Sequence, residues 1–259
     1  MTPGFAEYLA SWQSTALAGF IVFLRIGAVM AMLPVFGEMA VPVRVRLAAA
    51  AAFTAVVAPA VYAQVVPAAG SGLAVAIALA SETLIGLSIG VAVRLLVWAL
   101  QIAGVMIAQA TALSQLFGFS SGEPSPAVSQ ALWIGGLALA ASAGLHVHIA
   151  RILIESYAVL PAGVLPDAAS LLGWAVGHVA SAFALAFQLA VPALIASLLV
   201  NLAMGAMNRA MPALMITFIG VPAQTLAALG LIAVITPVLL AIWLAVFTSF
   251  LADPFGGVR

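Results

Sequence analysis

The apolar stretch LAVAIALASETLIGLSIGVAVRLLVWALQIAGVMIAQATALSQL, residues 73–116, sets the architecture of the chain. It contains no proline, so helix can continue through all of it. As one helix it would extend about 66 Å, roughly twice the hydrocarbon thickness of a bilayer. The stretch therefore predicts either a helix that protrudes from the bilayer or a bend. We expect the bend near residues 101–104, Gln-Ile-Ala-Gly, which would make a hairpin or a kinked pair.

The amino-acid composition indicates that the chain lies in an apolar environment. Of its 259 residues, 66% are hydrophobic and 5% are charged, whereas soluble domains contain roughly 45–50% apolar and about 25% charged residues. The mean hydropathy is +1.30, so only a bilayer, or a buried place in a large hydrophobic assembly, can accommodate the chain. A net charge of zero excludes nucleic acid as a partner. The absence of cysteine excludes disulfides and thiolate chemistry.

Six apolar runs are separated by polar or proline-containing connections, and no internal repeat is visible. Pro192 lies near the middle of one run, and Pro222 and Pro237 are expected to break the last. We therefore expect an all-α polytopic membrane protein of about six apolar helical segments, several kinked or hairpin-like, forming a single helical domain over residues 1–259. The runs are residues 15–36, 43–61, 73–116, 127–154, 171–208 and 213–251.

Arg25, Glu82 and Arg94 are charged residues that lie inside apolar runs, away from the ends of those runs. A guanidinium in mid-membrane costs roughly 2.5–3.5 kcal/mol on insertion scales, so each charge needs a partner. Gly86 and Gly90 recur between Glu82 and Arg94 at every fourth position, which predicts a face that contacts another helix. We expect one of two roles for these charges. They form buried ion pairs between helices, or they line the path of a stand-alone ion or solute transporter. Transporters usually have repeated halves, and this chain has no visible repeat.

The polar segment TALSQLFGFSSGEPSPAVSQ, residues 111–130, interrupts the apolar runs. Its glycines and prolines prevent a continuous helix, yet it carries bulky apolar side chains. Such a segment is either a plug or lid, or a connector whose rings pack back onto the helix ends. The residues of this candidate plug or seal are Leu113, Leu116, Phe117 and Phe119.

Enzymatic and metal chemistry are tested and rejected on the sequence. Residues 118–122 match the G-x-S-x-G pattern around Ser120, and Asp167 and His178 follow in the order of a hydrolase triad. That pattern needs a strand before the serine, whereas here it joins two apolar helices. His146 and His148 would point about 200° apart on a helix, so they cannot share one metal ion. We expect no catalytic, cofactor-binding or metal site.

Several stretches together resemble the FliR family of flagellar biosynthesis proteins, with its SctT counterparts in type III injectisomes. The most specific is NLAMGAMNRAMPALMITFIGVP, residues 201–222, and the stretches occur in family order over nearly the whole chain. In the central loop the chain departs from the family, because Gly118 and Phe119 replace an Asp-Pro pair. The other matching stretches begin at Arg25 (25–59), Glu82 (82–95), Leu100 (100–109) and Ile152 (152–163).

The resemblance implies a non-enzymatic membrane subunit of the type III flagellar protein export gate. Its partners would be FliP- and FliQ-like subunits, an FlhB-like subunit, membrane lipid and unfolded proteins in transit. Its location would be the bacterial inner membrane, within the flagellar basal body, and an injectisome remains the alternative apparatus. Buried charges would then meet neighbouring subunits, and residues 113–122 would correspond to the family's plug. Asn201, Arg209 and Pro212 mark a sharp turn where a charged side chain can bind helix carbonyls or a neighbouring subunit.

Overall fold

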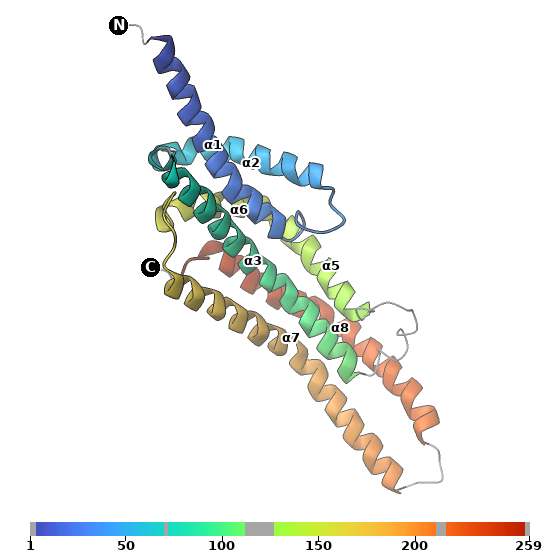
Figure 1. Ribbon diagram of the computed structural model, residues 1–259. Coiled ribbons are helices and arrows are strands. Elements are labelled where there is room, and N and C mark those ends of the chain that lie inside the picture. The colour runs from blue at the N-terminus through green and yellow to red at the C-terminus, as the bar shows by residue number, and fades with distance from the viewer. Residues whose placement is uncertain (1–3, 70–71, 112–126, 211–215, 257–259) are drawn as a thin grey trace. The chain divides into compact units, whose positions relative to one another are not determined.

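The computed structural model describes residues 4–69, 72–111, 127–210 and 216–256, and all regular structure within these ranges is helical (Figure 1). Five of the helices are each long and apolar enough to cross a membrane, and a bent pair provides a sixth candidate span. The expected fold class, an all-α polytopic membrane protein of about six segments, is confirmed. In chain order the elements are α1 (Phe5–Met32), α2 (Val43–Val65), the short 3-10 helix η1 (Val66–Ala68), α3 (Leu73–Ala110), α5 (Ala127–Ser142), α6 (Leu145–Val159), α7 (Ala168–Ala210) and α8 (Ile216–Ala252).

The expected bend at residues 101–104 is wrong, because α3 is one uninterrupted helix of 38 residues. At 1.5 Å per residue it extends about 57 Å, so the long helix without a bend is the alternative that the structure contains. Gly104 serves helix packing: a Cβ there would overlap the backbone of Ser129 in α5. The Ser129 hydroxyl donates a hydrogen bond to the Gln101 carbonyl at 2.9 Å. Gln101 and Gly104 therefore mark a close contact between α3 and α5.

The run from 127 to 154 is interrupted, against the expectation of one helix. It consists of α5 and α6, which are bent by 70° at a short break. Gly144 is the N-cap of α6 and has a φ of 76°, in the left-handed region that side chains disfavour. This glycine therefore lies at the boundary where one helix ends and the next begins.

The prolines within α7 and α8 do not end these helices. The helix α7 continues through Pro192 for 43 residues, and α8 continues through Pro237 for 37 residues. Membrane helices tolerate proline because neighbouring groups satisfy the freed backbone carbonyl. The expectation that the last run is broken at Pro222 and Pro237 is therefore wrong.

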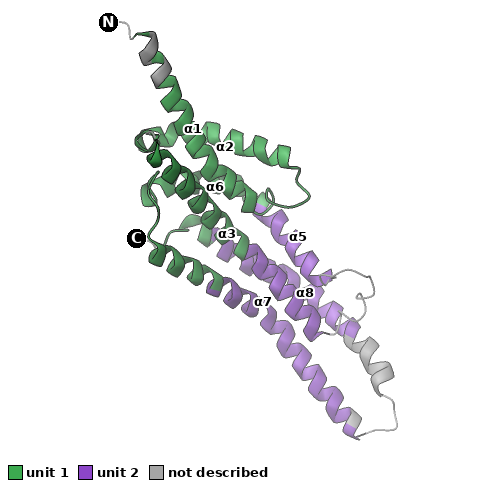
Figure 2. Cartoon of the chain, viewed as in Figure 1, with its two compact units in different colours: residues 1–95, 141–179, 249–259 green, residues 96–140, 180–248 purple. Residues whose placement is uncertain are grey.

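The chain divides into two compact units, shown in Figure 2. The first comprises residues 1–95, 141–179 and 249–259, and the second comprises residues 96–140 and 180–248. In the second unit, the Trp243 indole donates a hydrogen bond to the Leu96 carbonyl at 2.7 Å and stacks on Phe247. The core of the first unit surrounds Arg25, which has no exposed surface. This unit contains the candidate site.

Candidate functional site

A buried ion pair joins α1 to α3 in the first unit. Arg25 donates from Nε to Glu82 Oε2 at 2.7 Å and from Nη2 to Glu82 Oε1 at 2.8 Å. Both side chains have 0% exposure. This parallel, two-bond geometry is the strongest that a guanidinium and a carboxylate can form. The two residues, 57 positions apart in the sequence, therefore neutralise each other within the chain.

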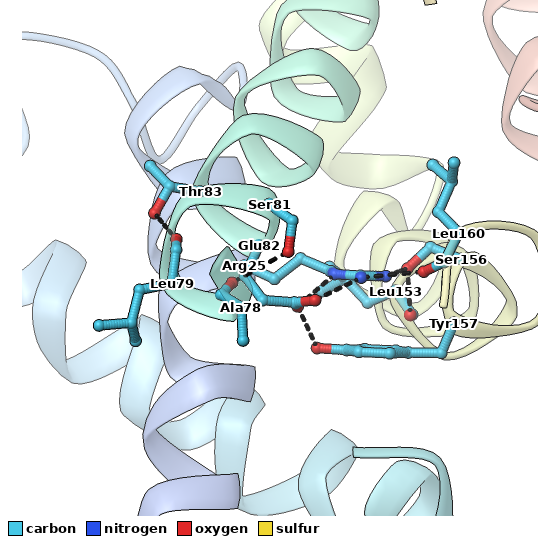
Figure 3. Close-up of polar contacts among 10 residues, drawn as sticks. All are labelled: Arg25, Ala78, Leu79, Ser81, Glu82, Thr83, Leu153, Ser156, Tyr157 and Leu160. Atoms are coloured by element: carbon cyan, nitrogen blue, oxygen red, sulfur yellow. Dashed lines mark hydrogen bonds and ion pairs between the residues drawn. The ribbon is translucent and has the colours of Figure 1, made fainter. Parts of the chain in front are cut away.

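The helix α6 closes the site from a third side (Figure 3). Arg25 Nη1 donates to the Ser156 hydroxyl at 2.8 Å, and Nη2 donates to the Leu160 carbonyl at 3.0 Å. The Tyr157 ring lies against the guanidinium, 3.7 Å from Cζ to the ring centroid, and its hydroxyl donates to Glu82 Oε2 at 3.0 Å. We call Arg25, Glu82, Ser156, Tyr157 and the Leu160 carbonyl the arginine network. It connects three helices that are far apart in the sequence.

Two glycines allow α1 and α3 to approach closely beside this network. A Cβ at Gly86 would overlap the Arg25 carbonyl oxygen, and one at Gly90 would lie 2.7 Å from the Met32 Cβ. Any side chain at either position would therefore push the helices apart and move Glu82 away from Arg25. The expected glycine contact face on α3 is found here, against α1.

The arginine network is closed, and this limits its chemistry. Among the described residues, no buried side-chain nitrogen or oxygen lacks a hydrogen-bond partner. A proton or solute path needs ionisable groups that water or the solute can reach, and Arg25 and Glu82 are both fully buried. The network therefore gives no support to the transporter alternative. Because the two charges pair within the chain, neither needs a neighbouring subunit.

Arg94 lies apart from this network. Its side chain is 20% exposed and approaches Glu38 at 3.7 Å, and its Nη1 donates to the Met32 carbonyl at 3.2 Å. Arg94 was grouped with the buried charges because it lies inside an apolar run. It is half-buried rather than fully buried, and it contacts α1 where that helix ends.

The residues of the hydrolase pattern have other contacts. Asp167 caps α7: its Oδ2 accepts hydrogen bonds from the amide and the hydroxyl of Ser170, both at 2.8 Å. These bonds, the backbone one first, lower the pKa of the Asp167 carboxyl. His178 packs edge-on against Trp174 and Phe250, with ring centroids 4.4 and 5.2 Å away. Ser120 lies outside the described residues.

The remaining candidates bring together no further site. Within the described ranges, no cluster of three His, Cys, Asp or Glu side chains that could hold a metal ion occurs. Arg151 and Glu155 form an exposed pair at 2.6 Å. Asn201 donates to the Ser197 hydroxyl at 3.4 Å, and Arg209 is exposed at the end of α7. Pro212 and the channel-seal residues Leu113, Leu116, Phe117 and Phe119 lie outside the described residues.

Residues 16–250 match the family described as "Bacterial export proteins, family 1". The chain belongs to this family of bacterial export proteins. It is also 36% identical over 230 residues to the flagellar biosynthetic protein FliR of Caulobacter vibrioides, which covers 86% of this chain and 90% of that protein. The resemblance to the FliR family is thereby confirmed, and its apolar helices make this member a membrane protein.

The arginine network links three of the stretches that resemble the export family. Arg25 begins the first stretch, Glu82 begins the second, and Ser156, Tyr157 and Leu160 lie in ILIESYAVLPAG, residues 152–163. Sequence reasoning missed the part played by Ser156 and Tyr157. The signal was weak, because the Glu-Ser-Tyr triplet lies in a helix that also contains His146, His148 and Arg151. Residues that resemble the family thus meet at one buried site.

Proposed function

We propose that this chain is a non-enzymatic membrane subunit of the type III flagellar protein export gate, forming part of its protein-conducting channel. The observation that carries the proposal is the match of residues 16–250 to bacterial export proteins, together with the similarity to a flagellar FliR. The similarity favours a flagellar apparatus over an injectisome. We further propose that the chain works in the bacterial inner membrane within the flagellar basal body, as a single helical domain.

The partners in this proposal are FliP- and FliQ-like subunits and an FlhB-like subunit, with unfolded proteins as the transported cargo. Large apolar side chains on the outside of α7 support contacts with lipid or with neighbouring membrane helices. We assign contacts with subunits to the end of α7, where Asn201 and Arg209 lead into Pro212. The exposed side chains on α7 include Phe183 at 58%, Phe187 at 54%, Leu198 at 59%, Leu199 at 62%, Leu202 at 62% and Met207 at 54%.

The resting channel also needs a seal, and we assign it to Leu113, Leu116, Phe117 and Phe119. A channel wide enough for unfolded protein would leak ions unless apolar side chains excluded water from it. The support is the sequence, in which these bulky residues lie among glycines and serines that allow withdrawal without melting a helix. Glu82 and Arg25 have a separate role, since they hold α1, α3 and α6 together.

Co-purification tests the proposal. The full-length chain, carrying an affinity tag, is expressed at native level and purified from membranes in mild detergent. FliP- and FliQ-like subunits should co-purify in fixed ratio. Arg209→Ala should reduce this co-purification while leaving the amount of inserted chain unchanged, and Arg151→Ala, an exposed arginine elsewhere, serves as the control. Purification of the wild-type chain as a stable monomer that binds a small solute would overturn the proposal.

A further inference from the structure

The connection between α1 and α2 concentrates positive charge. Of the chain's seven basic residues, Arg44, Arg46 and Arg94 gather at this connection with one acidic residue, Glu38. Two other arginines are neutralised by carboxylates, because Arg25 pairs with Glu82 and Arg151 pairs with Glu155. The connection therefore carries a net charge of +2 in a chain whose total charge is zero.

Two of the three arginines at the connection hold its backbone in place. Arg46 donates to the carbonyls of Phe36 at 3.2 Å and of Glu38 at 3.1 Å, and Arg94 binds the Met32 carbonyl. Arg44 is exposed and has no hydrogen bond or ion pair to any described residue. One guanidinium is thus free to bind a partner, beside two others that add to the local potential.

Steric restrictions, in addition to the arginine hydrogen bonds, limit the backbone conformations of this connection. Val35 has a φ of 74°, which a β-branched residue rarely adopts. Gly37 leaves no space for a side chain, because a Cβ there would lie 2.6 Å from the Ala31 carbonyl oxygen. A conformation held in this way keeps its outer side chains in one arrangement, so the surface is formed before any partner binds.

Exposed large apolar side chains lie close to Arg44 in the sequence. Met39 is 100% exposed, Val43 is 64% exposed, Val45 is 54% exposed and Leu47 is 52% exposed. We call Met39, Val43, Arg44, Val45 and Leu47 the turn patch. An exposed cation among exposed aliphatic side chains fits the boundary between lipid headgroups and acyl chains.

The position of the turn patch along the helices agrees with this chemistry. The candidate span in α1 comprises 22 residues, Ser11–Met32, and extends about 33 Å, close to the hydrocarbon thickness. The next candidate span begins at Val43. The connection therefore lies between two adjacent candidate spans, where a chain that crosses the bilayer twice meets the headgroups.

From this placement, we propose that the turn patch binds anionic phospholipid headgroups, with Arg44 on the lipid phosphate and the apolar side chains in the upper acyl region. Charge complementarity favours this partner: a planar guanidinium binds a phosphate through two hydrogen bonds, and net positive segments at the membrane surface attract anionic lipid. The binding goes beyond the export function and does not depend on it. An acidic groove on another protein is the competing occupant, which the experiment distinguishes.

The test uses the full-length chain in nanodiscs of equimolar phosphatidylglycerol and phosphatidylcholine, with bound lipid counted by native mass spectrometry. Arg44→Gln should lower the apparent affinity for phosphatidylglycerol about fivefold at low ionic strength, since one arginine near an anionic surface contributes about 1 kcal/mol. High salt should reduce the difference between the two chains. Arg44→Lys should retain most of the affinity, because the charge remains.

Arg151→Gln is the matched control, because it removes an exposed arginine that Glu155 already neutralises and should leave phosphatidylglycerol binding unchanged. Equal affinity of wild type and Arg44→Gln for phosphatidylglycerol would overturn the proposal. So would a loss of co-purified membrane proteins from Arg44→Gln without a change in bound lipid, since the turn patch would then be a protein contact. Arg44 lies on the surface, so these variants retain the fold.

Discussion

Removing the charge of Glu82 tests whether the arginine network holds the first unit together. Glu82→Gln keeps the size of the side chain but leaves the Arg25 guanidinium, which has 0% exposure, without a counter-charge. Breaking a buried ion pair by removing one partner costs roughly 3–5 kcal/mol, because the remaining charge is neither solvated nor paired. A loss of this size is comparable to a large part of the free energy of unfolding of a domain, about 5–15 kcal/mol.

The chain contains a matched control for this experiment. Arg151 and Glu155 form the same type of pair at 2.6 Å, but their side chains are 62% and 44% exposed. Exposed pairs one helical turn apart contribute about 0.3–0.5 kcal/mol. Glu155→Gln should therefore change stability several-fold less than Glu82→Gln, although both variants remove one carboxylate that binds an arginine.

Denaturant unfolding of the purified chain in mild detergent, followed by circular dichroism, measures both losses. A double variant, Arg25→Met with Glu82→Met, should recover most of the stability lost by Glu82→Gln, because no unpaired charge then remains. Equal small losses for Glu82→Gln and Glu155→Gln would refute the reasoning. A double variant as unstable as the single one would show that shape, rather than charge, decides the contact.

Three further changes test other parts of the structure. Gly86→Ala should destabilise the chain by about 1–3 kcal/mol, because its Cβ would meet the Arg25 carbonyl oxygen. Gly177→Ala has open space around it and should stabilise the chain by about 0.5–1 kcal/mol. If both variants changed the free energy of unfolding in the same direction, as measured by denaturant unfolding, the packing argument would be contradicted. The lowered pKa of Asp167 means that its contribution is complete above the ordinary aspartate pKa and is lost as pH falls through the lowered value. The protection of the Ser170 amide, measured relative to its intrinsic exchange rate at each pH, should therefore fall at acid pH in wild type and already be low at neutral pH in Asp167→Ala. Protection in wild type that does not change with pH would exclude this cap. Replacing Phe117 and Phe119 together by alanine should raise the ion conductance of cells at equal abundance of the complex, while an unchanged leak would place the seal in other subunits.

The sequence was sufficient to predict the features that depend on the number and length of its apolar runs. The all-helical membrane fold follows from composition, since a bilayer admits few alternatives for so apolar a chain. The glycine spacing of Gly86 and Gly90 also identified the face of α3 that contacts another helix. Arg25 and Glu82 were recognised as charges that need partners, because unpaired charges are costly in hydrocarbon.

Predictions from local sequence were wrong where tertiary contacts determine the role of a glycine or a proline. Gly104 and Gly144 are both glycines inside apolar runs, yet Gly104 packs against Ser129, and Gly144 takes a left-handed conformation between two helices. Proline was likewise overestimated as a helix breaker, because Pro192 and Pro237 lie inside continuous helices. Arg94 shares the stripe of Glu82 but is 20% exposed beside Glu38, although its neighbours Val93 and Leu96 are buried, a distinction that spacing alone does not contain.

The most direct test of the central claim is the amount of flagellar protein that cells export. In the bacterium that makes this chain, deletion of its gene should abolish the appearance of hook and filament proteins in the culture medium while their synthesis continues. The wild-type chain should restore export, Glu155→Gln should restore it equally, and Glu82→Gln should restore little. Export that continues unchanged in the deletion strain would contradict the assignment of this chain to the export gate.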